Sequence, residues 1–390
     1  MKKKNYRKLN KKVNYDKNKI KLKQIEKLII ISLLFFIFVY IINSNLILTK
    51  IEIFPKFYPK EKRVGVVNLQ NYQNVGNILV KFAMLKKLQE FGLNVTIIAP
   101  KLSKEYAITF VDRTISSNLV LINKNFSELN EKDFDYLIVN SDQTWGFYFS
   151  KYFYDFALLK FAQNWKTKKF IYAASLGQGE WIYRKSDEGL FKNLLQNFTG
   201  ISFREKRTIN LLEEHLGLKS VLVIDPTLLI DKNYYLKEII SYKSDINISE
   251  KYIFVYQLAN NIALEKTIKD ASEKLNLRVY KHDLKRKHFI ENFIFGINNS
   301  QCVITDSYHG TLLSIIFNKP FLTFNDKTRG KARFDSLKEV IQIDNRIILP
   351  SKFNNININL LSEPLNLNLT SINLLKSFSI HYLKQNLDLL

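Results

Sequence analysis

Apolar and polar positions along the chain follow two alternating patterns. Short runs of consecutive apolar residues, such as 252–258, predict buried strands, whereas apolar residues recurring every three to four positions, as at 78–91, predict helices. Helical patterns lie between most of the strand-like runs. Strands are expected at 64–69, 95–99, 119–122, 136–140, 170–175, 201–203, 221–224, 252–258, 279–280, 302–304 and 321–324.

Buried apolar strands that alternate with helices indicate parallel sheets covered on both faces. The pattern loosens at 226–250 and then restarts. We therefore expect an α/β protein with two doubly wound, Rossmann-like domains, at 63–225 and 251–390, joined by a linker at 226–250 and ending in a C-terminal helix. Ligands bind beyond the carboxyl ends of such strands, so the two domains are expected to face each other across a cleft.

The longest apolar run precedes this alternating pattern. No charged residue occurs between Lys27 and Lys50. A helix of about 20 residues spans a bilayer, so we predict a transmembrane anchor at 28–49. A cleavable signal peptide would have a shorter apolar run and a small-residue cleavage site, which is not evident here. A buried core helix fits poorly with so basic a flank.

The charge around this run predicts its orientation. Residues 1–27 contain twelve Lys and Arg, against five in residues 50–63. The positive-inside rule then predicts a cytoplasmic tail at 1–27, a stalk at 50–62 and a catalytic body in a lumen or periplasm. This tail also holds nearly half of the formal net charge of +23. Because no nucleic-acid-binding fingerprint accompanies it, we expect no nucleic-acid partner.

Two polar loops follow strands of the first expected domain. In Asn74-Val75-Gly76-Asn77, Gly76 permits close backbone approach, Asn77 can cap a helix, and free N–H groups suit an anion or sugar hydroxyls. A plain helix cap is the simpler interpretation. The loop Asn140-Ser141-Asp142-Gln143-Thr144-Trp145 carries polar side chains that could hold acceptor hydroxyls, although Asp142 could merely cap a turn.

Two further candidates lie at strand ends. Arg204 follows the strand at 201–203, where its guanidinium could bind a carboxylate or phosphate through two nitrogens. His309 lies between the strand at 302–304 and a helix that Gly310 and Thr311 are expected to open. That helix N-terminus is suited to an anion, and an imidazole titrates near neutral pH. A structural histidine with satisfied hydrogen bonds is the alternative.

No metal site is expected. Asp133-Phe134-Asp135 resembles the metal-binding D-x-D of some glycosyltransferases, but it precedes its strand and so lies at the wrong end of the sheet. The single cysteine, Cys302, lies in an apolar run and is expected to be a buried, unreactive side chain.

Taken together and in order, these segments resemble the polysaccharide pyruvyl transferase family. Its N-x-G-[DN] loop is matched at 74–77, and its G-S-D-Q-x-W loop at 140–145, with Asn140 in place of the glycine. Further matches are R-E at Arg204-Glu205, D-P-T-L-L at 225–229, T-D-S-x-H-G at 305–310 and an R-F segment at Arg333-Phe334. The resemblance runs from about residue 63 to 345.

The resemblance implies a fold like that of the two-domain GT-B glycosyltransferases. It also implies an enzyme that moves a pyruvyl group from phosphoenolpyruvate to hydroxyls of a glycan as a ketal, with His309 as the catalytic proton carrier and no cofactor besides the donor substrate. The donor-binding residues would be Arg204, Ser307, Gly310, Thr311 and Arg333. The acceptor-binding residues would be Asn74, Gly76, Asn77, Ser141, Asp142 and Gln143.

Two other functions compete with this one. A nucleotide-sugar glycosyltransferase could use the same fold, but the sequence has no clear nucleotide-binding signature. A non-catalytic, membrane-anchored glycan-binding protein is the second alternative, and histidine and arginine at the strand ends speak against it.

The uncharged segment at 28–49 generates a testable prediction. The full chain should stay with membranes through an alkaline carbonate wash, because a spanning helix is held by the bilayer core. A shortened chain that starts near Arg63 should remain in the soluble fraction. Release of the full chain by carbonate would contradict a membrane-spanning anchor.

Overall fold

The computed structural model describes most of the chain after residue 60. The described ranges are 61–68, 74–100, 109–122, 126–146, 153–177, 179–240, 250–286, 288–325, 330–343, 345–367 and 369–390. The predicted tail, the anchor at 28–49 and most of the stalk lie outside them. Among the described residues, no helix has both the length and the apolar character needed to cross a membrane.

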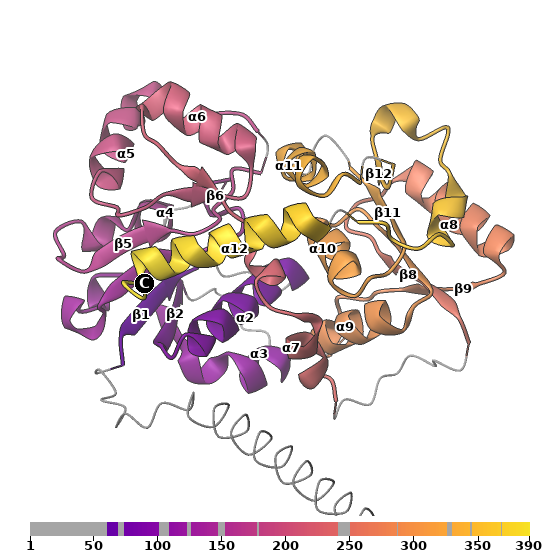
Figure 1. The fold of residues 1–390 in the computed structure, drawn as a ribbon, viewed down its shortest axis with the longest axis horizontal. Coiled ribbons are helices and arrows are strands. Elements are labelled where there is room, and N and C mark those ends of the chain that lie inside the picture. The colour runs from indigo at the N-terminus through magenta and orange to yellow at the C-terminus, as the bar shows by residue number, and fades with distance from the viewer. Residues whose placement is uncertain are drawn as a thin grey trace, which may run out of the picture. The chain divides into compact units, whose positions relative to one another are not determined.

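The first half of the described chain forms a parallel sheet in the order β3-β2-β1-β4-β5 (Figure 1). Its strands are β1 (Arg63–Val67), β2 (Asn94–Pro100), β3 (Leu119–Ile122), β4 (Tyr136–Val139) and β5 (Lys168–Ile171). The short strands β6 (Ser202–Phe203) and β7 (Val221–Leu222) pair with each other, and parallel bridges from Phe170 and Ala174 connect β6 to the β5 side. This is the strand order of a Rossmann sheet, and it reverses direction between β1 and β4.

The second half forms another five-stranded parallel sheet, in the order β12-β11-β10-β8-β9. Its strands are β8 (Tyr252–Tyr256), β9 (Arg278–Lys281), β10 (Cys302–Thr305), β11 (Phe321–Phe324) and β12 (Ile347–Ile348). Counted from β8, this is the flavodoxin-like order, in which the direction of winding reverses between β8 and β10. The expected α/β, GT-B-like Rossmann-type fold is therefore confirmed by the parallel sheets.

Helices connect these strands and cover both faces of each sheet. They are α2 (Val75–Glu90), α3 (Thr109–Thr114), α4 (Phe153–Leu158), α5 (Glu188–Leu195), α6 (Lys206–Leu216), α7 (Lys232–Lys237), α8 (Ile262–Leu275), α9 (Phe289–Asn299), α10 (Tyr308–Ile316), α11 (Lys331–Ile341) and α12 (Leu369–Asn386). Every residue of β4, β8, β10 and β11 is buried. Burial on both faces of the sheet therefore explains why these strands are runs of consecutive apolar residues.

The two sheets share one apolar core. Val66 of β1, Phe82 of α2, Phe254 of β8 and Leu312 of α10 belong to the same cluster of buried side chains. A second cluster lies on the opposite face of the first sheet and a third on the opposite face of the second sheet. Residues 61–390 form one compact unit as a result. The domain boundaries predicted within this unit stay a prediction.

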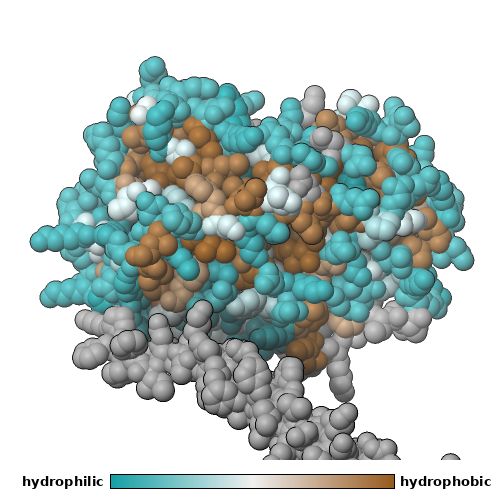
Figure 2. Space-filling model, in the orientation of Figure 1, coloured by the Kyte–Doolittle hydropathy of each residue, from teal (hydrophilic) through white to brown (hydrophobic). Residues whose placement is uncertain are grey.

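The last helix, α12, returns to the first half of the chain. The hydroxyl of Tyr382 donates to the backbone oxygen of Ile171 at 2.9 Å, and the backbone N–H of Ile224 donates to the hydroxyl of Ser379 at 2.8 Å. Figure 2 shows hydrophobic residues among hydrophilic ones on the face along which α12 runs. Leu374 and Phe378 are exposed apolar residues of α12.

Some strands end earlier than expected. The strand predicted at 170–175 ends at Ile171, because Ala173 has a φ of +52°, which a regular strand does not allow.

Cys302 is buried in β10, as predicted, and burial raises the pKa of its thiol to about 12. Its thiolate is therefore scarce at neutral pH.

Candidate active site

His309 lies in the first turn of α10. The prediction that Gly310 and Thr311 open this helix is wrong, since α10 begins at Tyr308. Ser307 caps the helix there, because its hydroxyl accepts a hydrogen bond from the backbone N–H of Gly310 at 3.2 Å. The imidazole of His309 is therefore carried by the helix itself, and it is buried.

The imidazole of His309 packs directly against the backbone of Gly76 in the first turn of α2. A Cβ atom placed on Gly76 would lie 1.9 Å from His309 Nδ1, far inside any permitted contact. No residue larger than glycine fits at position 76 unless the imidazole moves. The N-terminal turns of α2, from the first half of the chain, and of α10, from the second half, thus meet at His309.

Arg204, directly after β6, binds two carboxylates. Its Nη1 donates to Asp225 Oδ2, and its Nη2 lies 3.3 Å from Asp142 Oδ1. The Arg204 side chain is 1% exposed. Burial lowers the pKa of Arg204, but the two carboxylates raise it by more, so the guanidinium stays charged. Arg204 Nε has no hydrogen-bond partner among the described residues, but it lies 3.9 Å from the buried carboxylate oxygen Oε1 of Glu205 and forms an ion pair with it.

Asp225 follows β7 and lies between Arg204 and His309. Its Oδ1 accepts hydrogen bonds from the backbone N–H of Thr227 at 2.9 Å and from the Thr227 hydroxyl at 2.7 Å. Burial raises the pKa of Asp225, but the charge of Arg204, the neighbouring imidazole of His309 and the hydrogen bond from the Thr227 hydroxyl together hold it well below its usual range. An ionised carboxylate therefore lies 3.7 Å from His309 Nε2, beyond hydrogen-bond length. Nε2 itself has no hydrogen-bond partner in the described part of the protein.

Asp142 extends this network to α2. Its Oδ2 accepts a hydrogen bond from Asn77 Nδ2 at 3.1 Å, and Asn77 Oδ1 accepts one from Lys81 Nζ at 2.8 Å. Asp142 has a φ of +88°, so its backbone is strained in the conformation that aims this carboxylate at Arg204. Lys81 is buried, and loss of hydration lowers the pKa of its ammonium to about 7 although Asp142 opposes that shift.

A second guanidinium lies near Arg204. The ring of Tyr308 contacts both cations, with the central carbons of Arg204 and Arg333 each 5.1 Å from the ring centroid. Burial and the positive charge of Arg204 lower the pKa of Arg333. Gly330, with a φ of +87°, allows this side chain to lie close, since a Cβ there would be 2.3 Å from Arg333 Nη2.

Several other predicted site residues have contacts within the fold. Asn74 caps α2 by accepting from the backbone N–H of Asn77 at 3.1 Å. The hydroxyl of Thr311 is buried and lies 2.7 Å from that of Thr323. The side chain of Gln143 packs against Gly177. These contacts leave the predicted ligand-binding roles of these residues untested.

Sequence reasoning gave no role to Asp225, Lys81 or Tyr308. Asp225 opens the D-P-T-L-L segment, so its position after a strand was a usable signal. Lys81 was also detectable, because a lysine four residues after Asn77 interrupts an otherwise apolar helix face. The contact of Tyr308 with both arginines could not be found, since it depends on how the two sheets pack.

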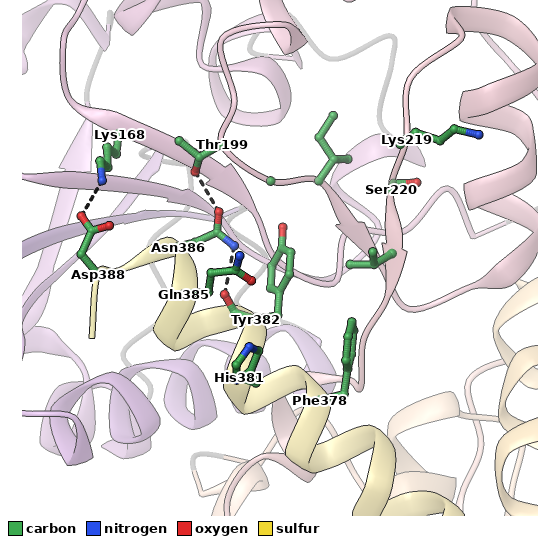
Figure 3. Close-up of a pocket in the computed structure, with 13 residues that line it drawn as sticks. Lys168, Thr199, Lys219, Ser220, Phe378, His381, Tyr382, Gln385, Asn386 and Asp388 are labelled. Atoms are coloured by element: carbon green, nitrogen blue, oxygen red, sulfur yellow. Dashed lines mark hydrogen bonds and ion pairs between the residues drawn. The ribbon is translucent and has the colours of Figure 1, made fainter. Parts of the chain in front are cut away.

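A cavity of about 570 Å³ lies where strands of the first half of the chain begin, at the other end of the strands from the candidate site (Figure 3). It is lined by Lys168, at the beginning of β5, and by residues of α12 that include Tyr382 and Asn386. Asn386 accepts from the Thr199 hydroxyl at 2.8 Å and donates to the backbone oxygen of Tyr382 at 2.9 Å. Because Lys168 begins its strand, this cavity is remote from His309, which follows the carboxyl end of β10.

The sequence model of the polysaccharide pyruvyl transferase family matches residues 74–328. The chain therefore belongs to this family, and it is a transferase that acts in the modification of a glycan. The match includes Gly76, Asp142, Arg204, Asp225 and His309. No curated protein sequence matches the chain significantly.

Several solved structures are similar to this chain at low sequence identity. S. aureus MnaA with UDP is 14% identical, with 84% of this chain and 98% of that chain covered and a TM-score of 0.46. Arabidopsis thaliana UGT89C1 with UDP-L-rhamnose is 10% identical, with 83% and 98% covered and a TM-score of 0.48. UDP-GlcNAc 2-epimerase from Neisseria meningitidis, bound to UDP-GlcNAc, is 12% identical, with 82% and 93% covered and a TM-score of 0.47. With scores below 0.5, the fold assignment rests on the strand order instead.

The contact between Gly76 and His309 predicts the effect of one added methyl group. Gly76→Ala should lower the free energy of unfolding by about 1–3 kcal/mol, because the imidazole must be displaced. It should also slow pyruvyl transfer. The control is Gly189→Ala in α5, where a Cβ meets nothing within 4 Å. This control should be as stable as the wild type or stabilised by about 0.4–1 kcal/mol. Urea denaturation measures both, and equal stability of the Gly76 variant and the wild type would contradict the contact.

The lowered pKa of Lys81 predicts a pH-dependent stability. In the unfolded chain Lys81 titrates near 10.5, and in the folded protein near 7. Between these values the unfolded state binds the extra proton, so the stability of the wild type should rise with pH. The advantage of Lys81→Met over the wild type should be largest below about pH 7 and shrink by about 1.4 kcal/mol per pH unit above it. A stability difference that does not vary between pH 6 and pH 9.5, measured by urea denaturation, would contradict a buried, proton-losing lysine.

Proposed function

We propose that this member of the polysaccharide pyruvyl transferase family transfers the pyruvyl group of phosphoenolpyruvate to two hydroxyls of a glycan, forming a cyclic ketal. The observation that carries the proposal is the buried imidazole of His309, whose Nε2 has no hydrogen-bond partner among the described residues and lies 3.7 Å from the ionised Asp225. A buried imidazole in that state is suited to moving protons rather than to holding the fold together.

The reaction has defined proton requirements. A proton added to the methylene carbon of phosphoenolpyruvate produces a methyl group and leaves positive charge at the enol carbon. One glycan hydroxyl attacks that carbon, phosphate leaves with its oxygen, and a second hydroxyl closes the ring. The two hydroxyls release two protons. One replaces the proton that was added to the methylene carbon, and the other leaves with phosphate. An acid–base group beside the reacting carbon is therefore required.

His309 is proposed to carry these protons through Nε2. Asp225 supports this role because its negative charge can stabilise the imidazolium that forms when His309 accepts a proton. Gly76 supports it by allowing the imidazole to pack directly against the first turn of α2, where a Cβ would collide with it. Asp225 acts through His309 and is proposed as a positioning residue, since Thr227 and Arg204 hold its carboxylate in place.

The donor carries a carboxylate and a phosphate, and both require cations. Arg333 is proposed to bind one of them, because its lowered pKa reflects burial and the repulsion from Arg204 that an anion would relieve. Arg204 is proposed to contact the donor through Nε–H, since its two terminal nitrogens already bind Asp225 and Asp142. Ser307, Gly310 and Thr311 stay predicted donor contacts at the N-terminus of α10.

The remaining parts of the proposal rest on the sequence. The reaction needs no cofactor because the donor itself supplies the activated carbon. The segment at 28–49 is proposed to anchor the enzyme as a single-pass membrane protein, with the tail in the cytoplasm and the catalytic body in a lumen or periplasm. Asn74, Gly76, Asn77, Ser141, Asp142 and Gln143 stay predicted acceptor contacts.

The decisive experiment combines the donor with a panel of galactose-, mannose- and hexosamine-containing glycans. We expect one class to gain the mass of pyruvate less one water, with release of phosphate, when phosphoenolpyruvate is the donor. His309→Gln should be about 10²- to 10⁴-fold slower, the usual contribution of a general acid or base.

The controls separate catalysis from folding. His381→Gln changes an exposed imidazole at the remote cavity and should keep the wild-type rate. Transfer from UDP-sugars but not from phosphoenolpyruvate would replace the proposed function with that of a glycosyltransferase. Full activity of the His309 variant would remove His309 from the mechanism.

A further inference from the structure

Two buried asparagines at the carboxyl ends of neighbouring strands have unsatisfied side chains. Asn68 follows β1 and Asn140 follows β4, and both are 0% exposed. Within the described residues, neither the oxygen nor the nitrogen of either carboxamide has a hydrogen-bond partner. The hydroxyl of Ser141, the next residue, is also buried without a partner there. Buried polar groups in folded proteins are nearly always paired, so this cluster requires an explanation.

The strand register places Asn68 and Asn140 at neighbouring positions, with their side chains on the same face of the sheet. Val67 of β1 pairs with Val139 of β4, and the backbone N–H of Asn140 donates to the backbone oxygen of Val67 at 2.9 Å. The backbone N–H of Asn68 donates to the backbone oxygen of Ile98 in β2, also at 2.9 Å. Side chains alternate along a strand, so Asn68 and Asn140 share a face with Val66 and Ile138 rather than with Val67 and Val139. That face belongs to the core cluster that includes α2.

This position is also the switch point of the first sheet. The strand order reverses between β1 and β4, and ligands of doubly wound sheets bind in the crevice at the carboxyl ends of the strands that flank such a reversal. The unsatisfied groups are therefore where the fold itself would place a ligand.

The neighbouring contacts connect the asparagines to His309. Asn140 is followed, after Ser141, by Asp142, whose carboxylate is held by Asn77 Nδ2 at 3.1 Å. Asn77 is adjacent to Gly76, against which the imidazole of His309 packs. A molecule bound at the two carboxamides would thus lie close to the proposed proton carrier.

We propose that Asn68 and Asn140 form a binding site for the hydroxyls of a neutral sugar. Each carboxamide offers donors and an acceptor, and a sugar hydroxyl can donate and accept at once, so two adjacent carboxamides match two hydroxyls of one ring. An anion would be bound by cations instead. The inference rests on the proposed function only in identifying this sugar as the acceptor unit of the glycan.

The test replaces each carboxamide with an apolar side chain of similar size. Asn68→Leu and Asn140→Leu should keep or raise the melting temperature, because replacing an unsatisfied buried polar group removes its desolvation cost. Asn386→Leu is the matched control. Both atoms of its carboxamide are hydrogen-bonded (Figure 3), so the same change there should lower the melting temperature.

Binding is measured without any donor, by saturation-transfer NMR with the methyl glycosides of galactose, mannose and N-acetylglucosamine. The wild type and Asn386→Leu should bind at least one of them, and Asn68→Leu and Asn140→Leu should bind it at least tenfold more weakly. A folded variant at either asparagine that binds as the wild type does would overturn the inference. So would a wild type that binds none of the three glycosides.

These outcomes are separable from the fate of the proposed function. A wild type that transfers pyruvate, while both leucine variants keep the acceptor KM, would contradict the sugar site and leave the proposed reaction intact. A wild type that binds a glycoside through the two asparagines, but transfers nothing from phosphoenolpyruvate, would contradict the reaction and leave the sugar site intact.

Discussion

The rest of the site depends on the pairing of Arg204 with two buried carboxylates. Asp142 comes from the loop after β4, Arg204 from the end of β6, and Asp225 from the turn after β7, so this pairing ties together three segments that are distant in sequence. Burying an ion is costly, and removing one partner of a buried pair typically costs about 3–5 kcal/mol. Each of these loops is therefore confined to the geometry that keeps all three charges paired.

The second half of the chain is attached to the same charges through α10. The ring of Tyr308 lies against Arg204 and Arg333, and the next residue, His309, places Nε2 3.7 Å from Asp225. Gly76 completes the arrangement by letting α2 approach the imidazole. The N-terminal turn of α10 follows β10, which flanks the switch point of the second sheet, and Asn68 and Asn140 mark the switch point of the first. The carboxyl ends of the strands at both switch points, where doubly wound sheets usually bind ligands, thus lie near the contact between Gly76 and His309.

The sequence predicted the sheets well and the site only in part. Runs such as 252–258 could be recognised because strands buried on both faces contain few polar residues, and every residue of β8 is indeed buried. The early end of β5 could not be foreseen, since it depends on the positive φ of Ala173. Arg204 and His309 were identifiable as polar residues at strand ends. Asp225 also follows a strand, so its position was detectable, but its pairing with Arg204 and the contact of Tyr308 with both arginines were not, because such contacts are decided by tertiary packing rather than by local pattern.

The buried charges of the site are paired, whereas some of its buried neutral groups have no hydrogen-bond partner among the described residues. The difference follows from the free-energy cost of burying each kind of group unpaired. An unpaired buried charge costs far more than an unpaired amide, so the fold must neutralise Arg204 with its own carboxylates. The proposed donor would therefore have to bind beside these existing partners, near the guanidinium groups of Arg204 and Arg333. Neutral carboxamides can remain unsatisfied at a tolerable cost, as those of Asn68 and Asn140 do. A neutral sugar would supply hydrogen bonds that the two carboxamides lack within the described residues, whereas the proposed anionic donor would have to compete with carboxylates that Arg204 already binds.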